Sequence, residues 1–308
     1  MELAMDSRRE IVLERKVFNN ILVATDFSEC SERAHSYAVG LARLYGAKLI
    51  FVHVRTDHAA APELALYAFD LVTSAIEQNV TSLEKWLRKH AVKYEVLVAG
   101  GTIQDVIGNL AEKVHVDLIV LGTHGRQGLG RFILGSVAEM IFRSTNCPAL
   151  TVGPHVPAAG DRLAFPEILL AAEDTPESIR AASYAISIAE EFQSNLSLLH
   201  VAPTAARFGP DSRRVARAMQ GKLNKLAPQD AFIWSEVNYC LEYGEPVEEI
   251  LAKAERINAQ LIVLGVREAV SFTSHLPGRT AYQIITRAHC PVLTIRGGGR
   301  GSLQENSL

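Results

Sequence analysis

The sequence predicts an α/β protein with two tandem copies of one doubly wound domain, each a five-stranded parallel sheet covered by helices on both faces. Short apolar runs alternate with longer amphipathic stretches, which is the pattern of strands and helices in a parallel sheet. Four apolar segments of the first half recur in the same order in the second half, which indicates a repeat. The chain of 308 residues is long enough for two domains of about 150 residues each.

The first half contains the elements of one complete copy. Its apolar runs predict buried strands, and its apolar residues at spacings of three and four predict helices that bury one face. The first helix starts near Ser28 and stops at Gly46, because glycine readily adopts the left-handed conformation that ends helices. The expected strands are 18–24, 48–54, 94–99, 117–121 and 148–152, and the expected helices are 28–45, 63–90, 103–113 and 136–144.

The second half begins again after Gly153–Asp161, a stretch rich in glycine and proline that marks a linker. The repeated pairs are Ile21–Ala24 with Ile168–Ala171, Phe51–Val54 with Leu198–Val201, Leu118–Gly122 with Leu261–Gly265, and Cys147–Val152 with Cys290–Ile295. The predicted divisions are an N-terminal extension at 1–18, a first domain at 19–153, a linker at 154–165, a second domain at 166–297 and a flexible tail at 298–308.

Charge and cysteine content narrow the function classes. The formal net charge of -3 gives no electrostatic reason to expect a nucleic acid or an anionic membrane as partner. The four cysteines form no Cys-x-x-Cys pair, so inert thiols in a reducing cytoplasm are expected instead of a zinc site or a redox dithiol. Residues 1–19 lack the apolar core of a signal peptide or membrane span. We therefore expect a cytoplasmic protein.

The stretch 122–137 is the candidate functional segment. It follows the apolar run Val116–Leu121 and leads into Ser136–Glu139, a capping box that opens a helix. Free main-chain N–H groups and the positive end of a helix dipole then converge on one place, which suits an anion. The glycine spacing, Gly122-x2-Gly125-x9-Gly135-Ser136, differs from that of a Walker loop and of a dinucleotide fingerprint.

This glycine spacing resembles the ATP-binding signature of the universal stress protein family, and the resemblance covers Asn20 to Val152. It implies a Rossmann-like domain with strand order 3-2-1-4-5, in which strands one and four are neighbours. It also implies ATP, or AMP, as the ligand, together with magnesium. The site residues that it implies are Ala24, Thr25 and Asp26 at the end of strand one, Val54 near adenine, Gly122 and Gly125 near ribose and phosphate, and Gly135, Ser136 and Val137 at the phosphate-binding helix. From their positions in the same loop, His124, Arg126 and Arg131 are expected to add positive charge.

Several of these residues also have an interpretation without a ligand. Asp26 can cap the first helix, and Ser136 caps its helix whether or not a phosphate is present. His53 lies inside an expected strand and is expected to pack in the core, and His124 can be a solvated loop histidine. The agreement of the acidic strand end, the spaced glycines and the capped helix favours nucleotide binding.

The second copy departs from the nucleotide pattern. Glu173 stands where Asp26 stands, while Glu268 replaces the second glycine and Arg279 replaces the serine. A carboxylate about 4 Å from a phosphate charge costs on the order of 4 kcal/mol at an effective dielectric of about 20. Thr280 and Gln283 are expected to form the capping box of the last helix. We therefore expect the second site to bind ATP weakly or not at all.

Three functions stay open from the sequence. The first is a regulatory stress-response protein that binds ATP in the first domain. The second is a slow ATP hydrolase that uses Asp26 and the glycine loop, although phosphoryl transfer also needs a residue that orients the nucleophile, and the sequence offers no clear candidate. The third is a scaffold that binds no nucleotide.

The family resemblance further implies that the last strands of the two domains pair across a two-fold axis into an intramolecular pseudo-dimer, and a homodimer of two chains stays open.

Overall fold

The computed structural model describes seven parts of the chain, namely residues 16–55, 62–123, 138–141, 145–208, 212–226, 237–266 and 279–296. For residues 62–71, 215, 225 and 279 it describes the backbone only. The predicted tail and most of the predicted N-terminal extension and glycine loop therefore lie outside the described residues.

Strands and helices alternate through both halves, as the periodicity predicts. The elements of the first half are β1 (Asn20–Ala24), α1 (Glu29–Tyr45), β2 (Lys48–Arg55), α2 (Pro62–Arg88), β3 (Lys93–Gly100), α3 (Ile103–Lys113), β4 (Leu118–Gly122) and β5 (Ala149–Val152), and residues 138–141 are also helical. The elements of the second half are β6 (Glu167–Ala171), α5 (Pro176–Phe192), β7 (Asn195–Ala202), α6 (Ala205–Phe208), α7 (Ser212–Leu226), β8 (Val237–Tyr243), α8 (Pro246–Arg256), β9 (Leu261–Val266), α9 (Arg279–Arg287) and β10 (Val292–Arg296).

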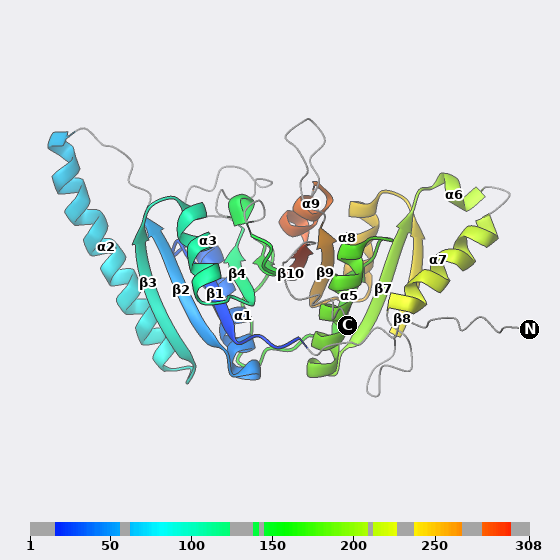
Figure 1. Cartoon of the computed structure of the whole chain (residues 1–308), viewed down its shortest axis with the longest axis horizontal. Helices are drawn as coiled ribbons and strands as arrows, with labels where there is room; N and C mark the ends of the chain where they lie inside the picture. Colours follow the sequence, from blue (N-terminus) through cyan, green and yellow to red (C-terminus); the bar gives the residue numbers. More distant parts are fainter. Residues whose placement is uncertain are drawn as a thin grey trace, which may run out of the picture.

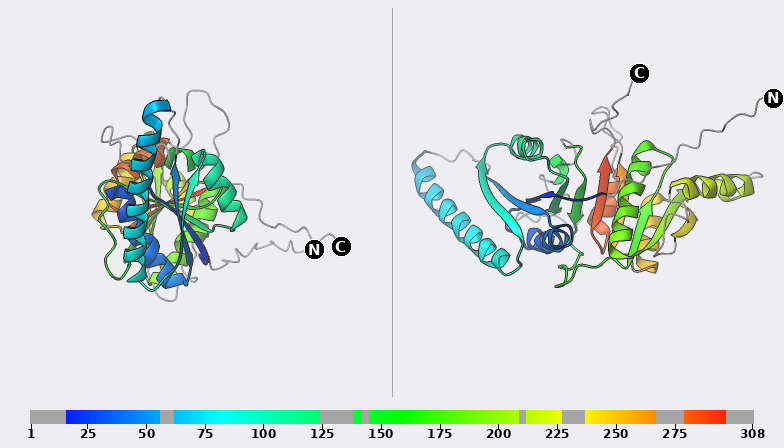
Figure 2. Two further views of the ribbon diagram at one scale, coloured as in Figure 1. Left: turned by 90° about the vertical axis from the view of Figure 1, so that its left-hand side faces the viewer. Right: turned by 60° about the horizontal axis from the view of Figure 1, so that its bottom comes forward.

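The described strands form one ten-stranded sheet in the order β3-β2-β1-β4-β5-β10-β9-β6-β7-β8. Strands are parallel within each half, and β5 pairs with β10 in antiparallel fashion. The predicted order 3-2-1-4-5 is confirmed in both halves, and so is the pairing of the two last strands. Figure 1 shows the result as two similar halves joined in the middle, with α2 at one end of the molecule and α7 at the other. In the right-hand view of Figure 2, β10 (red) lies near the middle of the molecule.

Two apolar layers cover the sheet, because the side chains of each strand alternate between its faces. Ile21 and Val23 of β1 pack on the face that α1, α2, α5 and α7 cover. Leu22 and Ala24 of the same strand pack on the opposite face, with α3, residues 138–141, α8 and α9. Each layer runs through both halves, so the halves share their core across the β5–β10 seam.

Segments before β1 and after β5 also connect the halves. The main-chain N–H of Lys16 donates to Ser187 Oγ on α5 at 2.8 Å, and the ring of Phe18 stacks on Tyr184 of the same helix. The linker runs along α1 so closely that a Cβ on Gly40 would lie 2.6 Å from the Cβ of Leu163. The first half is therefore held to the second by packing as well as by strand pairing.

Helix ends follow the local sequence in α1 but not in α9. Ser28 caps α1 by accepting the N–H of Ser31, and Gly46 ends that helix with a φ of 69°. The predicted cap at Thr280 is wrong, because α9 already begins at Arg279. A residue inside the first turn has helical backbone angles, whereas an N-cap is extended, so Thr280 cannot serve as the cap.

The cysteine side chains are thiols and not disulfides. All four cysteines are free, and burial raises the pKa of Cys147 and of Cys290 to about 12, so these two thiols are protonated and unreactive at neutral pH. Among the described residues, no helix combines the length and the apolarity that crossing a membrane requires.

Candidate functional site

The carboxyl ends of β1 and β4 lie next to each other at the place where the strand order reverses. Ala24, the last residue of β1, pairs with Leu121 of β4 on one side and with Val52 of β2 on the other. Thr25 and Asp26 therefore leave the sheet beside Gly122. The helix that follows β1 covers one face of the sheet and α3, which precedes β4, covers the other. Such a switch point opens a crevice between the loops, and it is where ligands bind to open parallel sheets.

The structure brings together five of the predicted site residues. Ala24 and Thr25 are buried, whereas Asp26, Val54 and Gly122 are half-buried at the same edge of the sheet. The other predicted residues, His124, Gly125, Arg126, Gly135, Ser136 and Val137, lie outside the described residues, as does Arg131. Their place in the site stays a prediction.

Thr25 is the hydrogen-bonding centre of the turn between β1 and α1. Its main-chain N–H donates to the carbonyl of Val52 at 3.0 Å, which extends the strand pairing by one residue. Its Oγ1 accepts the N–H of Phe27 at 3.0 Å and donates to Ser31 Oγ at 3.3 Å. Phe27 has a φ of 58°, a left-handed conformation that is uncommon for a residue with a Cβ. The turn is therefore held in a specific shape by a buried hydroxyl.

Asp26 projects from this turn without capping the helix. Its Oδ1 accepts the N–H of Ser28 at 3.0 Å, and the side chain of Ser28 provides the N-cap of α1. The interpretation of Asp26 as a mere helix cap is therefore wrong. Its half-buried carboxylate at the edge of the crevice can accept hydrogen bonds from a ligand hydroxyl.

The prediction that His53 packs in the core is wrong. His53 lies near the end of β2 and is half-buried. Its Nδ1 lies 2.9 Å from the carbonyl oxygen of Thr25, and its ring contacts the ring of Phe27 at a centroid distance of 4.9 Å. His200 makes the same contact in the second half, with the carbonyl oxygen of Ala172 at 2.9 Å. This histidine therefore joins strands one and two in both halves.

Gly122 is required by packing, whether or not a ligand is present. A Cβ at this position would lie 2.8–2.9 Å from main-chain atoms of Cys30 and Ser31 at the start of α1. Gly265 is in the same situation in the second half, where a Cβ would lie 2.6–2.8 Å from the backbone of Glu177 and Ser178. Since Gly265 meets the same packing requirement in a half where Glu268 and Arg279 replace the second glycine and the serine of the motif, Gly122 by itself does not indicate nucleotide binding.

His35 is a residue of this region that the sequence analysis missed. It lies on α1 and is only 4% exposed, and its Nε2 is 3.0 Å from Thr25 Oγ1. Burial lowers its pKa from 6.5 to about 4, although the charge of Asp26 acts in the opposite direction. The ring is therefore neutral at pH 7. The available signal was its position between Ala34 and Tyr37 on the apolar face of the predicted helix.

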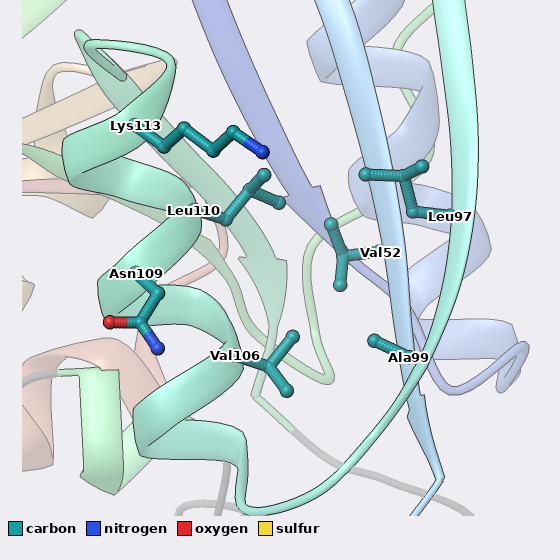
Figure 3. Close-up of a pocket in the computed structure, with 7 residues that line it drawn as sticks. All are labelled: Val52, Leu97, Ala99, Val106, Asn109, Leu110 and Lys113. Atoms are coloured by element: carbon teal, nitrogen blue, oxygen red, sulfur yellow. The ribbon is translucent and has the colours of Figure 1, made fainter.

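Two pockets flank the end of β2. Figure 3 shows the first, of about 190 Å³, between α3 and strands β2 and β3. It is lined by Val52, Leu97, Ala99, Val106, Asn109, Leu110 and Lys113. The second, of about 490 Å³, lies between α2 and the ends of β2 and β3, and it is lined by Arg55, Thr73, Ile76, Glu77, Val80, Thr81 and Val98. None of the described site residues lines either pocket. On β2, however, Val54 lies between Val52, which lines the first pocket, and Arg55, which lines the second.

Metal ligands are sparse in the described parts of the chain. No group of three or more His, Cys, Asp or Glu side chains is arranged there to hold a metal ion. Asp26 alone supplies a carboxylate on the β1–α1 turn, while Glu29 lies one residue past the cap of α1. A cation at this edge would therefore need a bound ligand and water for most of its coordination.

Comparisons with known proteins match both halves. The Universal stress protein family model matches residues 18–153 and 164–296. A universal stress protein of Methanocaldococcus jannaschii is 29% identical over 140 residues, which cover 44% of this chain and 82% of the relative. A putative universal stress protein of Staphylococcus aureus is 32% identical over 140 residues, which cover 44% of this chain and 84% of the relative.

A solved structure spans both halves at once. The crystal structure of a universal stress protein from Archaeoglobus fulgidus matches with a TM-score of 0.67 and 23% identity, covering 91% of this chain and 99% of that chain. The tandem arrangement of this fold thus occurs in another single chain.

Proposed function

Because the chain belongs to the universal stress protein family, we propose that its first half binds ATP, or AMP, at the carboxyl ends of β1 and β4 and acts as a regulatory protein of the stress response. The observation that carries the proposal is the register of these two strands. In this register Ala24 pairs with Leu121, so the turn that carries Asp26 starts next to Gly122, the first residue of the glycine-rich segment, at the switch point of the sheet.

The chemistry of each proposed contact follows from position. The carboxylate of Asp26 would accept hydrogen bonds from ribose hydroxyls, and the end of β2 at Val54 would contact the adenine ring. Gly125, Gly135, Ser136 and Val137 would offer main-chain N–H groups, together with the serine hydroxyl, to the phosphates. His124, Arg126 and Arg131 would add positive charge.

Magnesium would accompany the nucleotide without a protein cage of its own. Mg²⁺ keeps several waters and is usually held by one or two carboxylates together with substrate phosphates. Since Asp26 would be engaged by ribose, the phosphates and water would hold the ion. The bound ion would neutralise phosphate charge.

The second half would act as the fixed partner of the first. Glu173, Glu268 and Arg279 replace the residues that would contact nucleotide, so one nucleotide per chain is expected. In the second half, Asp174 on the turn after β6 forms an ion pair with Lys222 of α7, and this contact lowers the pKa of Asp174.

Mass spectrometry of small molecules released by denaturing the purified chain tests the proposal. We expect an adenine nucleotide from the wild type, or from the wild type after incubation with ATP and magnesium, and its loss from Asp26→Ala. A wild-type chain that releases no nucleotide even after incubation with ATP would contradict nucleotide binding. Equal release from both chains would show that Asp26 does not contact the ligand.

A further inference from the structure

We propose that His35 is a positioning residue for the first-half site. From within the core it holds the side chain of Thr25, and through Thr25 it holds the turn that presents Asp26. The effect on a ligand rests on the nucleotide binding proposed above, whereas the effect on the turn does not.

The contacts of the hydroxyls assign the direction of each hydrogen bond. Ser31 Oγ donates to the carbonyl of Ser28 at 2.9 Å, and Thr25 Oγ1 donates to Ser31 Oγ. With the proton of the Thr25 hydroxyl directed at Ser31 Oγ, Nε2 of His35 is the donor in its 3.0 Å contact with Thr25 Oγ1. The Phe27 N–H donates to the same oxygen. The one donor and two acceptor sites of this buried hydroxyl are therefore all occupied.

The imidazole itself is fixed by its surroundings. Its ring packs edge-on against Phe51 of β2 at a centroid distance of 5.1 Å and lies 6.4 Å from the ring of Trp86 on α2. Because burial keeps the ring neutral at pH 7, its Nε2 can carry a proton without bringing a charge into the core. A rigid donor thus points from the core toward the turn.

The turn needs such a donor because it is strained. A left-handed φ at a residue with a side chain costs on the order of 1 kcal/mol or more. Phe27 has this conformation, and its N–H is held by Thr25 Oγ1. Asp26, which lies between the two, takes its direction from both neighbours. Without the donor from His35, Thr25 Oγ1 would lose one of its three hydrogen bonds.

The second half shows what happens without this support. From β6 through β7 its elements have the same lengths as β1 through β2, so Ala172 corresponds to Thr25 and Ala182 to His35. Neither alanine can form the hydrogen bonds. Here the N–H of Glu173 donates to Ser178 Oγ at 2.9 Å, and Asp174, which corresponds to Phe27, is not among the residues with positive φ. The two halves therefore build different turns on the same scaffold, and only the first has the buried histidine.

The experiment compares His35→Leu, His35→Gln and Thr25→Val with the wild type. Leucine keeps the volume and removes the donor, glutamine keeps a side-chain N–H donor, and valine keeps the shape of threonine without the hydroxyl. Thr294→Val, which removes a buried hydroxyl near the seam, is the control for a general loss of stability. The measurements are the hydrogen-exchange rate of the Phe27 amide without ligand, the dissociation constant for ATP, and the unfolding midpoint.

We expect His35→Leu and Thr25→Val to speed exchange of the Phe27 amide and to weaken ATP binding, each by about tenfold, the equivalent of one lost hydrogen bond. His35→Gln should restore most of both. Thr294→Val should lower the unfolding midpoint without changing either. Unchanged Phe27 exchange and ATP affinity in Thr25→Val and His35→Leu would overturn the proposal. If the wild type binds no ATP, the proposed function fails, and the exchange rates of the Phe27 amide alone decide the role of His35. If His35→Leu does not fold, Thr25→Val and His35→Gln decide the role of His35.

Discussion

Thr151 and Thr294 occupy equivalent positions on the two strands of the seam, and each bonds the strand opposite. Thr151 Oγ1 donates to the carbonyl of Val292 at 3.0 Å, and Thr294 Oγ1 donates to the carbonyl of Ala149 at 3.2 Å. Each acceptor belongs to the residue directly opposite the donor in the antiparallel pair. Both side chains are at most 1% exposed, so these bonds are made in the core that the two halves share. The seam is thus specified by side chains as well as by main-chain pairing.

Replacing either threonine of the seam by valine should destabilise the whole chain. Thr151→Val and Thr294→Val each remove one buried hydrogen bond at constant shape, which costs about 1 kcal/mol of unfolding free energy. Urea denaturation measures the loss. Thr81→Val on the exposed surface of α2 is the control and should stay within about 0.5 kcal/mol of the wild type. Seam variants as stable as this control would contradict the role of the pair.

Adding a methyl group at Gly122 or Gly265 should destabilise both halves alike. The new Cβ would press on the first turn of α1 or α5, and overpacking of this kind costs about 1–3 kcal/mol. Chemical denaturation of Gly122→Ala and Gly265→Ala measures it. Gly108→Ala in α3, where a Cβ meets nothing within 4 Å, should instead be neutral or stabilising. If Gly122→Ala matched Gly108→Ala in stability, the packing explanation would be wrong.

Acid should weaken the fold through His35. Its pKa is about 4 in the folded chain and 6.5 for the unfolded reference, so the unfolded chain binds the proton first as the pH falls. The stability from keeping this ring neutral is present above pH 6.5 and is lost progressively down to pH 4, by about 3 kcal/mol over the full window. Denaturation at pH 7, 5.5 and 4.5 should show a steeper loss for the wild type than for His35→Gln. Equal slopes for the two chains would refute this assignment.

A carboxylate in the glycine loop should abolish nucleotide binding. Gly125→Asp would place a negative charge about 4 Å from the phosphates, at a cost on the order of 4 kcal/mol, while the fold stays intact. Circular dichroism and ATP titration measure the two effects. Gly160→Asp in the linker, at a position with open space around it, is the matched control and should bind as the wild type does. Unchanged affinity in Gly125→Asp would mean that the crevice lies elsewhere.

The fold was predictable because the strand pattern and the repeat of the domain are both visible over long stretches of the sequence. The runs Ile21–Ala24 and Leu118–Leu121 are buried throughout and flanked by turns, so they indicate central strands without any tertiary information. The start of α9 was not predictable in the same way. Thr280 matches a capping pattern, yet Arg279 is already helical, because a single residue carries too little preference to fix a helix boundary.

The place of the candidate site in the fold was predictable, but the side chains that hold its turn were not. Asp26 and Gly122 were proposed as site residues because they match the family's strand-one end and its glycine spacing. His35 was missed, since a lone histidine on a helix shows no periodicity, and its partner Thr25 meets it only through the packing of α1 on the sheet. His53 was placed in the core because strand pattern alone does not reveal that its ring is half-buried at the carboxyl edge.

Isothermal titration of the purified chain with ATP and magnesium tests the central claim most directly. The claim predicts one binding site per chain for the wild type and for Glu173→Ala in the second half, and no detectable heat of binding for Asp26→Ala. Two equivalent sites per chain, or a single site that survives Asp26→Ala unchanged, would contradict a nucleotide held at the carboxyl ends of β1 and β4.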